Sequence, residues 1–376
     1  MQDKVSNFKC LLKSPACLRL GTMSSASLTC YRCLCAFTGV LPKRKMTKLT
    51  YSILAIIAVG LLLIGMYRLS EFSRGPLKIG FLTVCPQDIR RRYIKEACSR
   101  MNVTRPSKPP YLKHIVIDHW HKLAYCLIPK VGSRTIRTIL GALLTRNASY
   151  VSGMDFPRIP GISILANMPP SLQQQVMEKY KKMIVVRHPY DRLLSVFDSK
   201  LLPTHREMVV ELLAKNVRQI NKYFSDVKGK ETSFDPNEQT LSFEEFVGVI
   251  SSQYNAGFRD RHWKTMFEHC DPCTIEYDFV LRLETLAKDY RVLSSYLHPP
   301  KWLTNSAPYL EQMKTSLLNP EEKMFNLLWR YENIDSVSLE GLKNVYEKDL
   351  GLFGYTWDVE KGANCRIPLG DGTYCC

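Results

Sequence analysis

One uncharged segment constrains the organisation of this 376-residue chain more than any other feature. Leu49 to Tyr67 reads LTYSILAIIAVGLLLIGMY. As a helix this segment rises roughly 28 Å, about the thickness of a bilayer core. A cleaved signal peptide is the alternative interpretation, but the segment begins far into the chain and is long for such a leader. We therefore predict a transmembrane signal-anchor at 49–67.

The charges around this segment predict its orientation. Residues 1–48 carry nine Lys and Arg residues against one Asp, and Lys43, Arg44 and Lys45 lie just before the apolar segment. Because Lys and Arg favour the cytoplasmic side, we expect residues 1–48 to form a cytoplasmic tail and the carboxyl part to be lumenal. Met46 is an alternative start that shortens the tail.

The part beyond the anchor has features that suit a lumenal compartment. Asn102 and Asn147 begin sequons for N-glycosylation. An even number of cysteines follows the anchor, which suits disulfides in an oxidising compartment, although the pairing is not deducible. Cys270 and Cys273 form a CxxC motif, but without a second pair the motif is weak evidence for zinc, and disulfides to other cysteines are favoured.

The net charge indicates the kind of partner. A formal charge of +17 favours polyanions, which include nucleic acid, anionic lipid and acidic substrates. The predicted topology excludes nucleic acid as a partner, because the lumen in which the basic domain lies contains none. The oligomeric state is left open by the sequence.

The predicted lumenal part divides into a stem and a larger folded domain. Residues 68–112 are rich in Arg, Lys and Pro and show no sustained apolar period, so they predict a stem. From 113 to 376 the pattern is α/β, beginning with the short apolar runs HIVID and LAYCLI and continuing with MIVV at 183–186. Residues 203–240 predict exposed helical material, and the chain beyond 320 is again helical.

Two strand–turn–helix units stand out in this domain, and each helix has one apolar face. The apolar positions of the first helix and then of the second are Ile136, Ile139, Leu140, Leu143 and Leu144, and Tyr190, Leu193, Leu194, Phe197 and Leu201. Two such units predict a parallel sheet flanked by helices, with ligand chemistry at the carboxyl ends of the strands.

The first unit contains a predicted anion site. Free N–H groups and the positive end of a helix favour an anion, and PKVGSRT adds the ammonium of Lys130 and the hydroxyls of Ser133 and Thr135. The Walker pattern is absent, so a nucleotide triphosphatase fits poorly. Alone, this turn is equally consistent with an ordinary strand–helix connection.

The second unit supports the anion-binding interpretation. Arg187 ends a strand, Pro189 suits the first helical position, and Ser195 follows two turns later beside the apolar stripe. A guanidinium and a hydroxyl so placed grip a second phosphate. Taken singly, Arg187 is better explained by a surface ion pair and Ser195 by a solvated helix position.

These residues resemble a known family. PKVGSRT looks like the 5'-phosphosulfate loop, and RHPYDRLLS like the 3'-phosphate element, of sulfotransferases that use PAPS (3'-phosphoadenosine 5'-phosphosulfate). LSFEEFVGVI, RDRHW, HCDPCTIEYDFVLRLETLAKDY and YEKDLGLFGY are similar, in that order, to the HNK-1/chondroitin 4-O-sulfotransferase family. The resemblance spans roughly residues 115–356 and implies a type II Golgi membrane enzyme with a P-loop-like sulfotransferase fold.

The resemblance implies a PAPS site without a metal. The implied cofactor-binding residues are Lys130, Val131, Gly132, Ser133, Arg134, Thr135, Ile136, Arg187, His188, Pro189, Tyr190, Asp191, Arg192, Leu193, Leu194 and Ser195. The resemblance also implies that Lys130 acts on the bridging and sulfuryl oxygens. The implied acceptor is a hydroxyl of a glycan or proteoglycan, with GalNAc or a related sugar expected.

A hydroxyl nucleophile also needs a general base. His262, in the RDRHW segment, is the expected catalytic base, while a hydrogen-bonded core histidine is the alternative. His114, His119 and His121 are rivals because they precede the strand that leads into the loop. Glu284 either orients a basic group or is an exposed helix residue, and the sequence favours neither.

The sequence departs from the family pattern at two places. The loop continues with Ser133-Arg134-Thr135-Ile136 where the family has Cys-Thr-Asn-Trp, and this is closer to uronyl 2-O-sulfotransferases. His188 stands where the family has Asp, which is the better helix cap. A uronyl acceptor is therefore the alternative within the enzyme class. Outside it, the alternative is a catalytically silent Golgi glycan-binding protein.

Overall fold

The computed structural model describes most of the predicted lumenal part, namely residues 84–101, 110–147, 149–150, 153, 156–229, 233–301, 303, 327–358, 362–369 and 373–376. The predicted tail 1–48, the predicted anchor 49–67 and Asn102 lie outside these residues. Among the helices of the described ranges, none combines the length and the apolar character needed to cross a bilayer.

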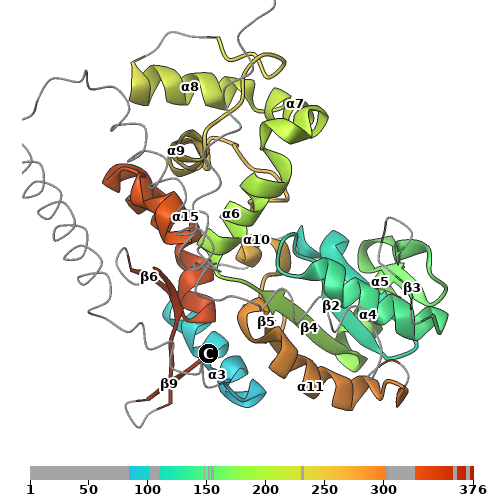
Figure 1. Ribbon diagram of the computed structural model, residues 1–376. Helices are drawn as coiled ribbons and strands as arrows, with labels where there is room; N and C mark the ends of the chain where they lie inside the picture. The colour runs from blue at the N-terminus through green and yellow to red at the C-terminus, as the bar shows by residue number, and fades with distance from the viewer. Residues whose placement is uncertain are drawn as a thin grey trace, which may run out of the picture. The chain divides into compact units, whose positions relative to one another are not determined.

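A five-stranded sheet with the order β3-β1-β2-β4-β5 forms the centre of the fold (Figure 1). Strands β2 (Leu123–Cys126), β4 (Lys181–Val186) and β5 (Phe279–Arg282) pair in parallel. Their runs of apolar residues are buried, as expected for strands covered on both faces. The predicted α/β class with a parallel sheet is confirmed for these central strands.

The other half of the sheet is antiparallel, which was not predicted from the sequence. Strand β1 (Ile115–Asp118) pairs antiparallel with β2 and with β3 (Ile162–Ile164). The reason is the length of the connection between β1 and β2. Only residues 119–122 separate them, and a parallel pair needs a crossover of a dozen or more residues.

Helices α4 (Ser133–Thr145), α5 (Pro170–Lys179) and α11 (Leu286–Leu297) accompany the sheet, and α6 (Pro189–Lys200) leads away from it (Figure 1). Both predicted strand–turn–helix units are confirmed. The predicted apolar face of α6 is fully buried, and in α4 Leu143 and Leu144 are the two positions that stay partly exposed.

A second hydrophobic cluster lies beyond the sheet. It is formed by α6 together with α7 (Arg206–Ala214), α8 (Val217–Lys228), α9 (Phe243–Gln253) and α15 (Ser336–Phe353). The prediction of helix is confirmed for most of 203–228 and of 327–353, whereas residues 233–240 form a loop with a turn. The expected exposure of 203–240 is only partly right, because its helices bury one apolar face in this cluster.

The predicted stem differs from the structure in its second half. Residues assigned to it form α3 (Gln87–Arg100), whose Ile94 and Ala97 join the sheet core. The apolar pattern of the sequence does not indicate this helix, because a charged residue, Arg90, is buried on its inner face. That guanidinium donates to the carboxylate of Asp289 at 2.8 Å and to the carbonyl of Val280 at 2.6 Å, so its charge is satisfied. The folded domain therefore begins before residue 113.

The remaining elements are short connections and hairpins. They comprise η2 (Pro110–His114), η3 (Phe156–Arg158), η4 (Leu165–Asn167), η5 (Pro203–His205), α10 (Met266–Cys270), η6 (Leu283–Thr285), β6 (Tyr355–Asp358), β7 (Gly362–Cys365), β8 (Ile367–Pro368) and β9 (Tyr374–Cys375).

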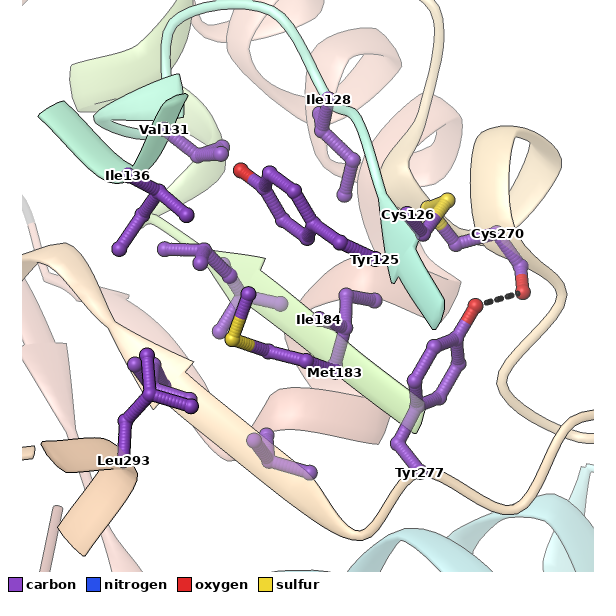
Figure 2. Close-up of a cluster of buried hydrophobic side chains, with 14 of the residues drawn as sticks. Tyr125, Cys126, Ile128, Val131, Ile136, Met183, Ile184, Cys270, Tyr277 and Leu293 are labelled. Atoms are coloured by element: carbon purple, nitrogen blue, oxygen red, sulfur yellow. Dashed lines mark hydrogen bonds between the residues drawn. A yellow bond between two sulfur atoms is a disulfide. The ribbon is translucent and has the colours of Figure 1, made fainter. Parts of the chain in front are cut away.

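All eight cysteines after the predicted anchor form disulfides. The pairs are Cys85–Cys375, Cys98–Cys273, Cys126–Cys270 and Cys365–Cys376. The preference for disulfides at the CxxC motif is thereby confirmed, since its two cysteines bind different partners. Figure 2 shows the Cys126–Cys270 bond at the edge of the sheet core, where the Tyr277 hydroxyl donates to the Cys270 carbonyl at 2.7 Å.

Loss of the Cys126–Cys270 bond is expected to destabilise the domain. The bond joins β2 to α10 across 144 residues, and both cysteines are completely buried. We expect the double change Cys126→Ala and Cys270→Ala to lower the free energy of unfolding by about 2–4 kcal/mol. Urea denaturation of wild type and variant measures this, and equal unfolding free energies would contradict it.

Candidate active site

Three consecutive parallel strands end at one edge of the sheet, and each delivers part of the candidate site. Strand β2 leads into residues 129–132, β4 into Arg187 and His188, and β5 into Glu284. Hydrogen bonds join these ends directly. Arg187 Nη1 donates to the Lys130 carbonyl at 3.0 Å, and the His188 N–H donates to Glu284 Oε1 at 2.7 Å.

The loop after β2 has an unusual backbone. Lys130 has a φ of 69°, which costs a non-glycine residue roughly 1–2 kcal/mol. Gly132 has a φ of 85°, and a Cβ there would lie 2.8 Å from Leu283 Cδ1. Glycine is therefore favoured at 132, chiefly because any other residue would be strained at this φ, and a side chain there would also displace the Leu283 methyl group.

Helix α4 begins directly after this glycine. The first N–H groups of a helix have no acceptor within it, and Gly132 supplies no side-chain cap. The N–H groups of Ser133, Arg134 and Thr135 therefore form the positive end of the helix. No acidic residue lies in this first turn. The turn thus has the composition of an anion site.

Several cationic side chains surround the Lys130 ammonium. Burial lowers its pKa to about 8, and the charges of Arg187, Lys200 and Arg134 act in the same direction, while the Asp198 carboxylate partly opposes them. Cations that depress one another's protonation are stabilised by an anion placed among them. The electrostatics of the site therefore suit a highly charged anionic ligand.

Ser199 holds the side chain of Lys130. Lys130 Nζ donates to Ser199 Oγ at 2.8 Å, and that hydroxyl donates to the Ser195 carbonyl at 2.8 Å. Ser199 was not identified from the sequence. The available signal was its position one helical turn after Ser195, on the same face of α6.

Arg187 is fixed by a bidentate ion pair. Its Nε and Nη2 donate to the two oxygens of Asp191, both at 2.7 Å, while Nη1 binds the Lys130 carbonyl. These bonds use three of its five N–H groups within the described part of the chain. Asp191 thus orients the guanidinium, and both side chains keep some solvent access.

His188 caps α6, at the position where the resemblance implies an aspartate. Its Nδ1 accepts from the Tyr190 N–H at 3.2 Å, and its Nε2 lies 3.0 Å from the Thr356 carbonyl. Burial lowers the pKa of His188 to about 4, so the ring is neutral at pH 7 and Nε2 donates. The substitution therefore keeps the cap and adds a contact to β6.

Arg192 connects the loop to the segment that contains His262. Its side chain is buried, and its Nε donates to the Pro129 carbonyl at 2.9 Å. The two terminal nitrogens donate to the carbonyls of His262 at 3.0 Å and Lys264 at 2.8 Å. One guanidinium therefore brings together the two segments from which the sequence predicted catalytic residues.

His262 belongs to a histidine–carboxylate pair. Its Nδ1 lies 2.5 Å from Asp260 Oδ1, which also accepts from the His262 N–H. Burial opposes ionisation of Asp260, but the hydrogen bonds from His262 outweigh it and lower the pKa of this carboxyl. An ionised Asp260 accepts a hydrogen bond from the Nδ1–H of His262. This tautomer leaves Nε2 of the ring without a proton, so Nε2 can accept one. Asp260 was not singled out from the sequence.

The rival histidines separate into two groups. His119 and His121 lie in the turn before β2, at the end of the strand opposite the loop, and bind Ser163 and Asp118. His114 lies at the same edge as the loop, because its carbonyl accepts from the Leu127 N–H. Burial lowers the pKa of His114 to about 4, which makes it a weaker base than an ordinary histidine.

Several predicted cofactor-binding residues have buried side chains. They are Val131, Ile136, Pro189, Tyr190, Arg192, Leu193 and Leu194. Their side chains hold the loop and α6 in position, and contact of these residues with a ligand stays a prediction. Asn147 is exposed, as a glycosylated asparagine must be, and its modification also stays a prediction.

The known proteins that this chain resembles are sulfotransferases. The profile of the sulfotransferase family matches residues 113–356. Carbohydrate sulfotransferase 12 of Mus musculus is 27% identical over 293 residues, covering 71% of this chain and 67% of that protein. Carbohydrate sulfotransferase 11 of Rattus norvegicus is 25% identical over 294 residues, covering 73% and 77%. No solved structure matches significantly. Because the profile covers more than half of its length, the chain belongs to the sulfotransferase family.

Proposed function

We propose that this protein transfers a sulfuryl group from PAPS to a hydroxyl of a carbohydrate. The observation that carries the proposal is the meeting of two anion-binding turns at adjacent parallel strands, where Arg187 donates to the Lys130 carbonyl. The two turns suit the two phosphate groups of PAPS. The names of the similar proteins, which are carbohydrate sulfotransferases, support the carbohydrate acceptor.

The donor is proposed to bind across both turns. The N–H groups at the start of α4, with the hydroxyls of Ser133 and Thr135, hold the 5'-phosphate. Arg187 and Ser195 hold the 3'-phosphate, the guanidinium using the N–H groups that Asp191 leaves available. Gly132 permits the left-handed backbone of the loop, and a side chain there would displace the Leu283 methyl group.

The transfer itself needs a cation and a base. The acceptor hydroxyl attacks the sulfur in line with the bond to the 5'-phosphate, and that bond breaks. Lys130 neutralises the charge that develops on the departing oxygen. His262 Nε2 takes the hydroxyl proton, and Asp260 stabilises the resulting imidazolium. No metal is proposed for these steps.

The acceptor is proposed to be a glycan or proteoglycan chain, with GalNAc or a related sugar of a chondroitin- or dermatan-type chain as the first choice. The resemblance of the segments after residue 240 to chondroitin 4-O-sulfotransferases supports this choice. The Ser133-Arg134-Thr135 sequence supports a uronyl 2-O acceptor as the alternative.

We further propose that the enzyme is a single-pass type II protein of the Golgi membrane. The uncharged segment 49–67 and the basic residues before it support this topology. The eight paired cysteines support an oxidising, lumenal location for the domain.

Incubation with radiolabelled PAPS tests the function. The full-length protein in detergent is presented with chondroitin, dermatan, heparan and N-glycan acceptors, and label should appear on one or more of them. Retention on immobilised adenosine 3',5'-bisphosphate provides the control. Retention without transfer to any acceptor contradicts the proposed acceptor class, and absence of retention contradicts PAPS use and leaves a silent glycan-binding protein.

Donor affinity is expected to depend on pH through Lys130. The pKa of this residue is lowered to about 8 in the ligand-free protein, so its charge is lost as pH rises through that value. The dissociation constant of adenosine 3',5'-bisphosphate should therefore rise between pH 7 and pH 9.5. Calorimetry measures it, and Lys130→Arg should abolish this dependence because arginine stays charged. A flat profile in the wild type contradicts the prediction.

A further inference from the structure

A partly exposed cluster lies beside Lys130 and is unused by the proposed mechanism. It consists of Trp329, Arg330 and Asp198, which we call the Trp-Arg-Asp cluster. Arg330 Nη2 lies 3.5 Å from Asp198 Oδ1, and the Arg330 guanidinium lies 5.6 Å from the centre of the Trp329 ring. Trp329 is 54% exposed, although it is among the largest apolar side chains of the domain.

The position of the cluster connects it to the transfer site. Asp198 directly precedes Ser199, whose hydroxyl accepts from Lys130 Nζ at 2.8 Å, and the Asp198 carboxylate is near enough to Lys130 to act on its pKa in the raising direction. Both residues lie in the last turn of α6, which Figure 1 shows running from the sheet edge toward α7. The same guanidinium of Arg330 lies 5.9 Å from the ring of Phe197 on this helix. The cluster is therefore anchored to the helix that holds Lys130.

The chemistry of the three side chains suits a charged sugar. An exposed tryptophan offers a rigid apolar face for the C–H face of a pyranose. A guanidinium binds a carboxylate or sulfate in bidentate fashion, and a carboxylate accepts hydrogen bonds from sugar hydroxyls. Together these groups can hold a sugar that is apolar on one face and anionic at its edge.

The ordinary explanations for these residues are a scattered surface tryptophan and a surface ion pair. A single exposed tryptophan needs no function. Here, however, one guanidinium contacts both the tryptophan ring and the acid, and that acid acts electrostatically on Lys130 of the proposed transfer site. The Arg330–Asp198 pair is long and both side chains are partly exposed, so an anionic ligand can displace Asp198 at little cost.

We propose that the Trp-Arg-Asp cluster is an acceptor subsite for an anionic sugar, a pyranose that carries a carboxylate or a sulfate ester. Trp329 stacks on the ring, Arg330 binds the anion, and Asp198 accepts from a hydroxyl. The inference rests on the proposed carbohydrate sulfotransferase function and deepens it by naming the class of sugar next to the reacting one.

Acceptor kinetics at saturating PAPS test the subsite. The acceptors are chondroitin sulfate, its desulfated form and its carboxyl-reduced form, used with the full-length protein. Arg330→Ala should raise the KM of the anionic acceptors about tenfold or more, as expected for the loss of a charge-assisted hydrogen bond. Affinity for adenosine 3',5'-bisphosphate should stay within about twofold, since the donor contacts are elsewhere. Trp329→Ala should raise the KM of all three acceptors.

Arg92→Ala is the matched control. Arg92 is also an exposed arginine, it pairs with Asp88 at 3.4 Å, and its loss changes the net charge equally. The KM values of this variant should equal those of the wild type. Retention of the full-length protein on immobilised chondroitin sulfate, and its loss in Arg330→Ala, gives a measurement that does not depend on transfer.

The acceptors also identify the anion. A wild-type preference that disappears on carboxyl reduction identifies the carboxylate, and one that disappears on desulfation identifies the sulfate ester. Transfer by the wild type with equal KM for all three acceptors overturns the subsite alone. The subsite is also overturned if Arg330→Ala and Arg92→Ala behave alike in both kinetics and retention. Absence of transfer to any glycan contradicts the proposed function, while the retention measurement still decides the subsite.

Discussion

Replacement of Lys130 by methionine is expected to lower the rate of sulfuryl transfer by roughly a hundredfold to a thousandfold, the usual cost of removing one group that stabilises transition-state charge. Methionine keeps most of the length of the side chain and removes its charge. Burial and neighbouring cations already depress the pKa of this ammonium, so its charge acts in a site with little solvent screening. Single-turnover kinetics with radiolabelled PAPS measure the rate of the chemical step.

Lys122→Met is the matched control for this change. Lys122 is also a non-glycine residue with a positive φ, at 49°, and it precedes the same strand at the opposite end. Its replacement should leave the rate of transfer unchanged. If Lys130→Met retains more than about a tenth of the wild-type rate, Lys130 does not stabilise the departing oxygen.

Replacement of His262 by alanine is expected to lower the rate of transfer by roughly a hundredfold or more, because the acceptor hydroxyl loses its base. Affinity for adenosine 3',5'-bisphosphate should be retained, since Arg192 holds this segment through carbonyls that alanine keeps. Asp260→Asn should cause a smaller loss of rate, because an amide can still accept from the ring but no longer stabilises the imidazolium.

His114→Ala decides between His262 and its rival. His114 lies at the same sheet edge, but its ring packs edge-on against His269, with ring centres 4.6 Å apart. We expect this variant to keep most of its transfer activity. His205→Ala, at an exposed position before α7, controls for the loss of any histidine. Full activity of His262→Ala together with loss in His114→Ala would assign the base to His114.

Local patterns predicted the elements of this fold well where the hydrophobic period was regular. The apolar stripe from Tyr190 to Leu201 predicted the buried face of α6, and the apolar run at 183–186 predicted β4. Burial of one face of α6 produces its apolar stripe, and burial of both faces of β4 produces its continuous apolar run, so the sequence records each kind of burial directly.

The parts that could not be predicted from the sequence depend on contacts between distant residues. The inner face of α3 carries Arg90, whose partners lie about 190 residues further along the chain, so its pattern does not look apolar. The disulfide partners likewise depend on the finished fold. The antiparallel pairing of β1 is different, because it follows from the short connection 119–122, a local signal that the apolar pattern alone does not contain. None of these is encoded in a local period.

The candidate site was predicted in its parts but not in its connections. Lys130, Arg187 and His262 were identified from the residues that surround them in the sequence. Arg192 was assigned to the donor site because it lies in the same element as Arg187. Its three carbonyl partners are separated from it by 63 to 72 residues, and only the structure reveals that it joins the loop to the His262 segment.

The bonds of Arg192 also bear on how such an enzyme can evolve. The guanidinium recognises main-chain oxygens, and every amino acid supplies one. A change of side chain at Pro129 or Lys264 therefore leaves the acceptor atoms of these bonds in place, and with them the connection between the loop and the segment of the proposed base. Side chains around this connection can therefore change, and substrate preference with them, while the main-chain bonds that join the two segments are kept.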